Sequence, residues 1–183
     1  MKKLSVIVLI AFLGVSWGCV SDQENMQIIY ERDLKSIEEY VAQNPIASVK
    51  ELVDSGTGIR IYWTTVSDLE EKAEVSDTVS VDYVGKMLDN RVFDTSIESV
   101  ARANSIFSSA REYVPLRYPI GFGFTLAGFE YAILQMKQGE KATVIMPSLY
   151  GYGSVDVGTI PRNSPLIFEL DVTEVKKIVI EDL

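Results

Sequence analysis

The side chains that most often carry out chemistry in proteins are almost missing from this sequence. It contains no histidine and a single cysteine, Cys19. Without histidine, a Ser–His–Asp triad, a Cys–His dyad and imidazole-ligated zinc or haem are all excluded. One cysteine can form neither an intramolecular disulfide nor a thiolate metal cluster. We therefore expect no metal and no cofactor, and a function that needs neither thiol nor imidazole chemistry.

The overall composition is that of one folded domain, or of a small domain with appendages. The 183 residues are 47% hydrophobic and 23% charged, which is typical of globular proteins and excludes wholesale disorder. The formal net charge is −9 at neutral pH. A chain this acidic lacks the positive surface that binds phosphates, so we expect no nucleic acid among its partners.

Residues 1–18 are predicted to be a bacterial lipoprotein signal peptide. Two lysines precede an apolar run over residues 4–13. That run is shorter than the ~20 residues that span a bilayer, but it suits a secretory signal. It leads to Cys19 at the expected cleavage point, and acylation there would anchor the mature chain to a membrane. The sequence predicts an envelope lipoprotein, in the outer membrane on its periplasmic or surface side. The alternative is a plain secretory signal with an incidental cysteine.

Residues 19–55 are predicted to form a tether followed by an amphipathic helix. Apolar residues recur at intervals of three or four, at Met26, Tyr30, Leu34, Ile37 and Val41. This spacing indicates a helix over residues 26–41, which Asn44 and Pro45 would end. Two interpretations stay open. The helix packs on its own domain, or it is a docking surface, including a homodimer interface through residues 26–41.

Residues 56–183 show the alternating pattern of β-strands. Apolar side chains alternate over residues 59–64, 79–84 and 166–173, and a further strand is expected over 141–146. Residues 126–136 have helical spacing, enough for one short helix. Strands with one inward face indicate an antiparallel sheet. Together these elements predict an α+β domain with the helix laid on one face of the sheet.

Six short motifs follow one another in the order of a known enzyme family. They are Val-x-Tyr-x-Gly (81–85), Val-Phe-Asp-Thr-Ser (92–96), Gly-Phe-Glu (128–130), Tyr-Gly-Tyr-Gly (150–153), Ile-Pro (160–161) and Leu-Ile-Phe-Glu-Leu (166–170). With them, residues 56–176 closely resemble the FKBP-type peptidyl-prolyl cis–trans isomerases. The resemblance implies an FKBP-like antiparallel sheet wrapped on one short helix, here preceded by the N-terminal amphipathic helix.

The resemblance also implies which residues form the proline pocket. The catalytic positions of the family match Asp94, Tyr152 and Phe168. Tyr152 corresponds to the hydroxyl donor, and the backbone N–H of Leu126 to the group that caps the bound peptide. Phe129 stands where the family often has tryptophan. The substrate-binding positions match Tyr83, Phe93, Leu126, Phe129, Ile160, Leu116 and Tyr118.

These residue types suit the reaction on physical grounds. An X–Pro amide rotates over a barrier of ~18–20 kcal/mol, because its C–N bond has double-bond character. The twisted transition state is less polar than the planar amide, so an apolar, aromatic cavity favours it. No nucleophile, metal or general base is needed, which fits a chain without histidine.

Residues 97–115 are an insertion relative to compact members of the family. Residues recur at helical intervals along this segment and predict a short helix, which Pro115 would end. They are Ile97, Val100, Ala101, Asn104, Phe107 and Arg111. Because the segment starts just after Asp94, we expect it at the pocket rim. It is either a surface elaboration or a lip that contacts unfolded chains.

The predicted function is peptidyl-prolyl isomerisation that assists the folding of exported proteins in the bacterial cell envelope. Its partners would be proline-containing unfolded or exported polypeptides, and the membrane through lipidated Cys19. Two alternatives stay open. One is a binding module of the same fold with weak catalysis, and the other is a structural envelope or motility lipoprotein.

Overall fold

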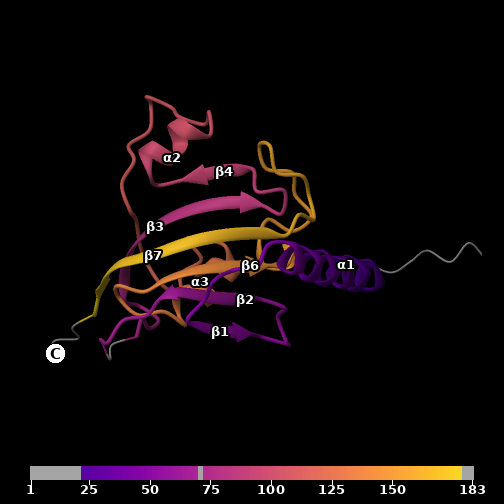
Figure 1. Cartoon of the computed structure of the whole chain (residues 1–183), viewed down its shortest axis with the longest axis horizontal. Helices are drawn as coiled ribbons and strands as arrows, with labels where there is room; N and C mark the ends of the chain where they lie inside the picture. The colour runs from indigo at the N-terminus through magenta and orange to yellow at the C-terminus, as the bar shows by residue number, and fades with distance from the viewer. Residues whose placement is uncertain (1–21, 70–71, 179–183) are drawn as a thin grey trace, which may run out of the picture.

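The computed structural model describes residues 22–69 and 72–178, and Figure 1 shows them as a single curved sheet that carries the helices. The predicted signal peptide, residues 1–18, and the predicted acylation site, Cys19, lie outside the described residues. The division of the chain into signal, tether and domain therefore stays a prediction.

One antiparallel sheet forms the frame of the molecule. Its strands are β1 (Lys50–Val53), β2 (Arg60–Thr65), β3 (Thr78–Met87), β4 (Val92–Thr95), β5 (Leu116–Pro119), β6 (Lys141–Met146) and β7 (Leu166–Lys176). The spatial order is β1-β2-β6-β7-β3-β4, and β5 also pairs with β3. The two longest strands, β3 and β7, lie side by side at the centre (Figure 1).

Four helices accompany the sheet within the described residues. They are α1 (Asp22–Gln43), α2 (Glu98–Ala103), α3 (Ala127–Ile133) and the 3-10 helix η1 (Ser148–Tyr150). The predicted helix over residues 26–41 lies within α1, and the predicted short helix corresponds to α3. The predicted fold class, an α+β domain with an antiparallel sheet, one short helix on it and a preceding N-terminal helix, is confirmed.

The main hydrophobic core lies between α3 and the sheet. Phe129 and Ile133 of α3 are buried against Val79 and Val81 of β3, together with Phe168 of β7. Burial of each such side chain stabilises the fold by about 1.5–3 kcal/mol relative to leaving it in water. The apolar residues that alternate along these strands are therefore the ones that face α3. Their burial against this helix explains the alternation.

The prediction that each strand has a single inward face is wrong beneath α1. Tyr62, Ile145 and Ile167 point to the face away from the main core, yet they are buried in a second cluster with Ile37 of α1. These strands therefore have apolar residues on both faces. The physical reason is that α1 packs on its own sheet, as one of the two interpretations of its sequence expected.

Strand β1 was not expected from the sequence. Its residues are mostly exposed, and it pairs only with β2 at the edge of the sheet. Only Leu52 of this strand is half-buried against the main core, so the hydrophobic alternation that revealed the other strands is missing here. The sheet thus extends into the stretch 19–55 predicted as tether and helix.

The insertion leaves the edge of the sheet and returns to it. β4 pairs with the second half of β3, where Val84 faces Thr95, and β5 pairs with the first half, where Val81 faces Leu116. Residues 96–115 therefore protrude between two strands that share one edge, above β4 in Figure 1.

The helix in the insertion is shorter than the sequence pattern predicts. It ends at Ala103, because the Asn104 side chain bonds back to the Val100 carbonyl oxygen and Ser105 adopts a positive φ of 59°. Phe107 and Arg111 consequently lie beyond the helix. The Phe107 ring stacks on that of Tyr113.

Candidate functional site

Most of the predicted site residues converge on one cavity. It has a volume of about 290 Å³ and lies between the β3–β4 hairpin, α3 and the loop after η1. Its lining consists of Tyr83, Asp94, Leu116, Phe124, Thr125, Leu126, Phe129, Tyr152 and Phe168. A hollow of about 320 Å³ beside Lys141 and Asp171 is larger, but it contains only Tyr83 from the predicted set.

The walls of this cavity are aromatic rings in edge-to-face contact. The Phe168 ring lies 5.3 Å from that of Phe129 and 5.7 Å from that of Phe93, measured between centroids. The Tyr83 ring contacts Phe129 at 6.1 Å. Such pairs add about 0.5–1.5 kcal/mol each beyond area burial, so they hold the walls in place.

Gly85 of β3 allows two of these rings to approach the strand. A Cβ atom at this position would lie 2.7 Å from the Phe93 ring and 3.0 Å from the Phe168 ring. Any side chain larger than hydrogen would therefore force these rings to move. The glycine that ends the Val-x-Tyr-x-Gly motif is therefore a steric requirement of the site.

Three of the predicted residues lie behind the cavity surface. Phe93 contacts the rings of Tyr152 and Phe168, and Tyr118 contacts that of Phe129. Ile160 is 4% exposed and belongs to the main core. These three support the walls, whereas the other seven line the cavity. The binding and catalytic roles assigned to all ten stay predictions.

Asp94 is held by a hydrogen-bonded network at the mouth of the cavity. Its carboxylate accepts a hydrogen bond of 2.6 Å from the Tyr83 hydroxyl, and another from the backbone N–H of Thr95. Arg111 forms an ion pair with the same carboxylate and donates to the Tyr83 hydroxyl at 3.0 Å. The polar edge of the cavity is thus a triad of Asp94, Tyr83 and Arg111.

Sequence reasoning did not assign Arg111 to the site. It placed this residue on the apolar stripe of the insertion, although an arginine on such a stripe is itself a signal that the position serves something other than the core. The segment 105–115 returns from α2 to β5 and carries Arg111 over Asp94. Phe124 and Thr125, which also line the cavity, were missed as well.

The hydroxyl groups of the site remain protonated at neutral pH. Burial raises the pKa of Tyr83 to about 12, and its hydrogen bond to Asp94 acts in the same direction. Burial also raises the pKa of Tyr152, with a further contribution from the charge of Asp94. Within the described residues the Tyr152 hydroxyl makes no hydrogen bond of its own, so it is free to donate to a bound molecule.

Comparison with known proteins agrees with this geometry. Residues 70–173 match the family described as FKBP-type peptidyl-prolyl cis-trans isomerase. The chain belongs to this family. The match covers β3 to β6 and most of β7, as far as Thr173, together with α2, α3 and η1, whereas α1, β1 and β2 precede it.

Two curated relatives carry names of the same kind. The chain is 45% identical to a short-type peptidyl-prolyl cis-trans isomerase of Methanocaldococcus jannaschii over 80 residues, which are 44% of this chain and half of the archaeal protein. It is 33% identical to FK506-binding protein 2 of Kluyveromyces lactis over 117 residues, covering 63% of this chain and 74% of the yeast protein.

The site of this FKBP-type isomerase suits rotation about a prolyl amide. Aromatic walls favour the less polar twisted amide over the planar one. The Tyr152 hydroxyl, which makes no hydrogen bond within the described residues, gives this apolar cavity a hydrogen-bond donor. Leu126 precedes α3 in an extended conformation, with φ of −63° and ψ of 144°. Its backbone N–H donates to no acceptor within the described residues, and it offers a second donor.

Arg111→Ala is expected to lower kcat/KM for a proline tetrapeptide by roughly threefold to tenfold. Without the guanidinium, Asp94 and Tyr83 lose the partner that fixes their orientation at the cavity mouth. A protease-coupled isomerisation assay measures the change. Arg102→Ala is the matched control, since Arg102 lies in the same insertion but pairs with Glu98. Equal kcat/KM values for Arg111→Ala and wild type would contradict a role for the triad.

Proposed function

We propose that this chain is a membrane-anchored prolyl isomerase that assists the folding of exported polypeptides in a bacterial cell envelope. The observation that carries the proposal is the cavity itself. It combines aromatic walls with the unbonded hydroxyl of Tyr152, and it adjoins the Asp94–Tyr83–Arg111 triad. Its substrates would be unfolded segments that contain proline, since the cavity is open at the surface and its aromatic lining suits a small apolar ring.

The proposed anchor rests on the N-terminal sequence. An apolar run after two lysines leads to the only cysteine of the chain, Cys19. Among the residues that the structure describes, no helix combines the length and the apolar character needed to cross a bilayer. Acylation of Cys19 would hold the protein at the membrane and leave the cavity facing the aqueous compartment.

One experiment tests the location and the reaction separately. Cells that make the full chain or its Cys19→Ser variant are fractionated, and isomerisation of a proline tetrapeptide is measured in the membrane and soluble fractions. We expect wild-type activity in the membrane fraction. The Cys19→Ser activity should move to the soluble fraction or stay with unprocessed precursor of higher mass.

The outcomes separate the two parts of the proposal. Mature Cys19→Ser protein in the same membrane fraction as wild type would overturn the lipid anchor. Wild-type protein that binds a labelled proline peptide without accelerating its isomerisation would favour the binding module instead. Homodimerisation through residues 26–41 stays a prediction, and α1 already packs on its own sheet through Ile37.

A further inference from the structure

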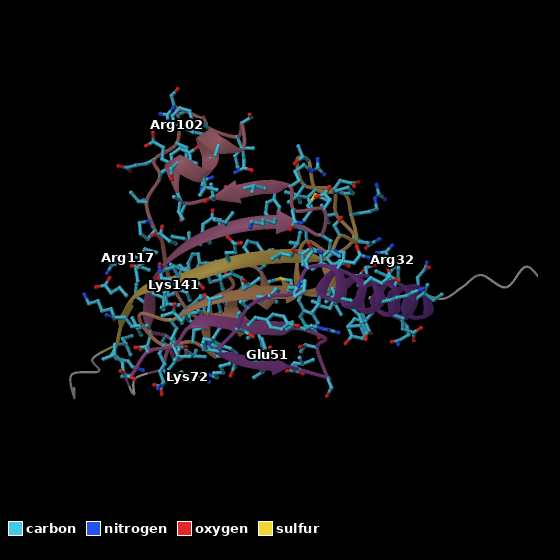
Figure 2. The ribbon with its side chains drawn as sticks, in the orientation of Figure 1. Arg32, Glu51, Lys72, Arg102, Arg117 and Lys141 are labelled. Carbon is cyan, nitrogen blue, oxygen red and sulfur yellow. The ribbon has the colours of Figure 1, made fainter. Side chains whose placement is uncertain are left out.

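The N-terminal helix reaches the loop that carries Tyr152. α1 precedes residues 70–173, so it is an addition to the part that matches the family. We propose that Asp33 and Arg32 of α1 are positioning residues for the isomerase reaction, because they clamp residues 148–163, here called the Tyr152 loop. Figure 2 shows Arg32 on α1 at the end of the sheet where this loop lies.

The first arm of the clamp is a buried carboxylate. Asp33 is 0% exposed, and its Oδ2 accepts hydrogen bonds from both the backbone N–H of Ser148, at 2.9 Å, and the Ser148 hydroxyl. Its Oδ1 accepts one of 2.7 Å from Arg32. A buried carboxylate is costly unless its oxygens are hydrogen-bonded, and these charge-assisted bonds are stronger than neutral ones. The contact between α1 and Ser148 is therefore firm.

Ser148 is also hydrogen-bonded to both neighbours of Tyr152. Its carbonyl oxygen accepts hydrogen bonds from the backbone N–H groups of Gly151, at 3.0 Å, and of Gly153, at 2.9 Å. Tyr152 lies between these two glycines. With its N–H and hydroxyl bound to Asp33, Ser148 is held on one side by α1 and on the other side by the turn around Tyr152.

The second arm of the clamp holds the far side of the same loop. Arg32 donates a hydrogen bond of 2.6 Å to the carbonyl oxygen of Asn163. The backbone N–H of Asn163 in turn donates to the carbonyl oxygen of Gly153 at 2.6 Å. The two arms thus meet at Gly153, one through Ser148 and the other through Asn163.

The hydrogen bonds of Asp33 and Arg32 matter because the glycines beside Tyr152 would otherwise allow the loop backbone many conformations. Glycine restricts backbone rotation least, and Gly153 adopts a positive φ of 58°. The hydroxyl of Tyr152 must lie within hydrogen-bonding distance of the substrate carbonyl, and small misplacements of a catalytic group reduce rates strongly. Asp33 and Arg32 therefore act through Tyr152 and need not touch the substrate.

The test compares the effect of Asp33→Ala in two backgrounds, using the full chain and a proline tetrapeptide. In the wild-type background we expect kcat/KM to fall by roughly fivefold to tenfold at a temperature where the variant is fully folded. In the Tyr152→Phe background the same substitution should change kcat/KM less than twofold, since the hydroxyl it positions is gone. Lys35→Ala, an exposed change on the same helix, is the control and should leave both values unchanged.

A purely structural role for Asp33 gives a different result. It would lower kcat/KM by the same factor in both backgrounds, or not at all, and either outcome would overturn the proposal. Should Asp33→Ala fail to fold, Arg32→Ala decides by the same comparison, because its exposed side chain can be removed without opening a cavity. The inference rests on the proposed isomerase activity. If the wild-type protein had no such activity, the proposed function would be wrong, whereas the contacts of Asp33 and Arg32 with the Tyr152 loop would stand.

Discussion

Tyr152→Phe and Asp94→Ala are each expected to reduce isomerisation strongly while leaving the domain folded. Tyr152→Phe removes a free donor from an apolar cavity, and the loss of one such hydrogen bond corresponds to about fivefold to tenfold in kcat/KM. Asp94→Ala should lower kcat/KM by about tenfold or more, because hydrogen bonds to a charged group are stronger than neutral ones. It leaves Arg111 and the Tyr83 hydroxyl without their common acceptor at the mouth of the cavity.

A protease-coupled assay on a proline tetrapeptide measures both effects, and thermal unfolding verifies that the variants remain folded. Tyr62→Phe is the matched control, because Tyr62 lies under α1 on the other face of the sheet. If both site variants retained wild-type kcat/KM, the cavity would not be the catalytic site. Tyr152 and Asp94 would then be features of a binding module.

Phe168→Ala is expected to lower the free energy of unfolding by about 3–5 kcal/mol, the usual cost of truncating a buried phenylalanine. Phe168 is 4% exposed, and its ring contacts those of Phe93, Phe129 and Tyr83. Its removal would leave a cavity between β7 and α3, where three neighbouring rings lose their contact surface. Urea unfolding followed by tryptophan fluorescence measures the change.

The matched control for this substitution is Phe124→Ala, since Phe124 also lines the cavity but is 67% exposed. Its unfolding free energy should change by no more than about 0.5 kcal/mol, as is usual at surface positions. A similar small change for Phe168→Ala would show that the ring is not part of the core. Loss of activity in Phe168→Ala reports on the site only when it is measured below the unfolding temperature of this variant, where the protein is folded.

The sequence alone was sufficient for those features that depend on local periodicity or on motif order. Alternating apolar residues in β3 and β7 predicted strands, because successive side chains of a strand face opposite sides of a sheet. The six motifs indicated the family, and seven of the ten site residues that the family resemblance implied line one cavity. The periodicity of α1 likewise predicted a helix, but it left open which surface that helix covers.

The tertiary structure decided the contacts between residues with no local relation. Asp33 and Ser148 are separated by 115 positions, and Arg111 and Asp94 by 17, with α2 and an irregular stretch between them. No periodicity connects such pairs, so the assignment of Arg111 to the site and of Asp33 to the Tyr152 loop required the folded chain. The two-sided burial beneath α1 has the same cause. Whether Tyr62 or Ile167 faces water depends on where a distant helix packs, and alternation within a strand carries no information about that.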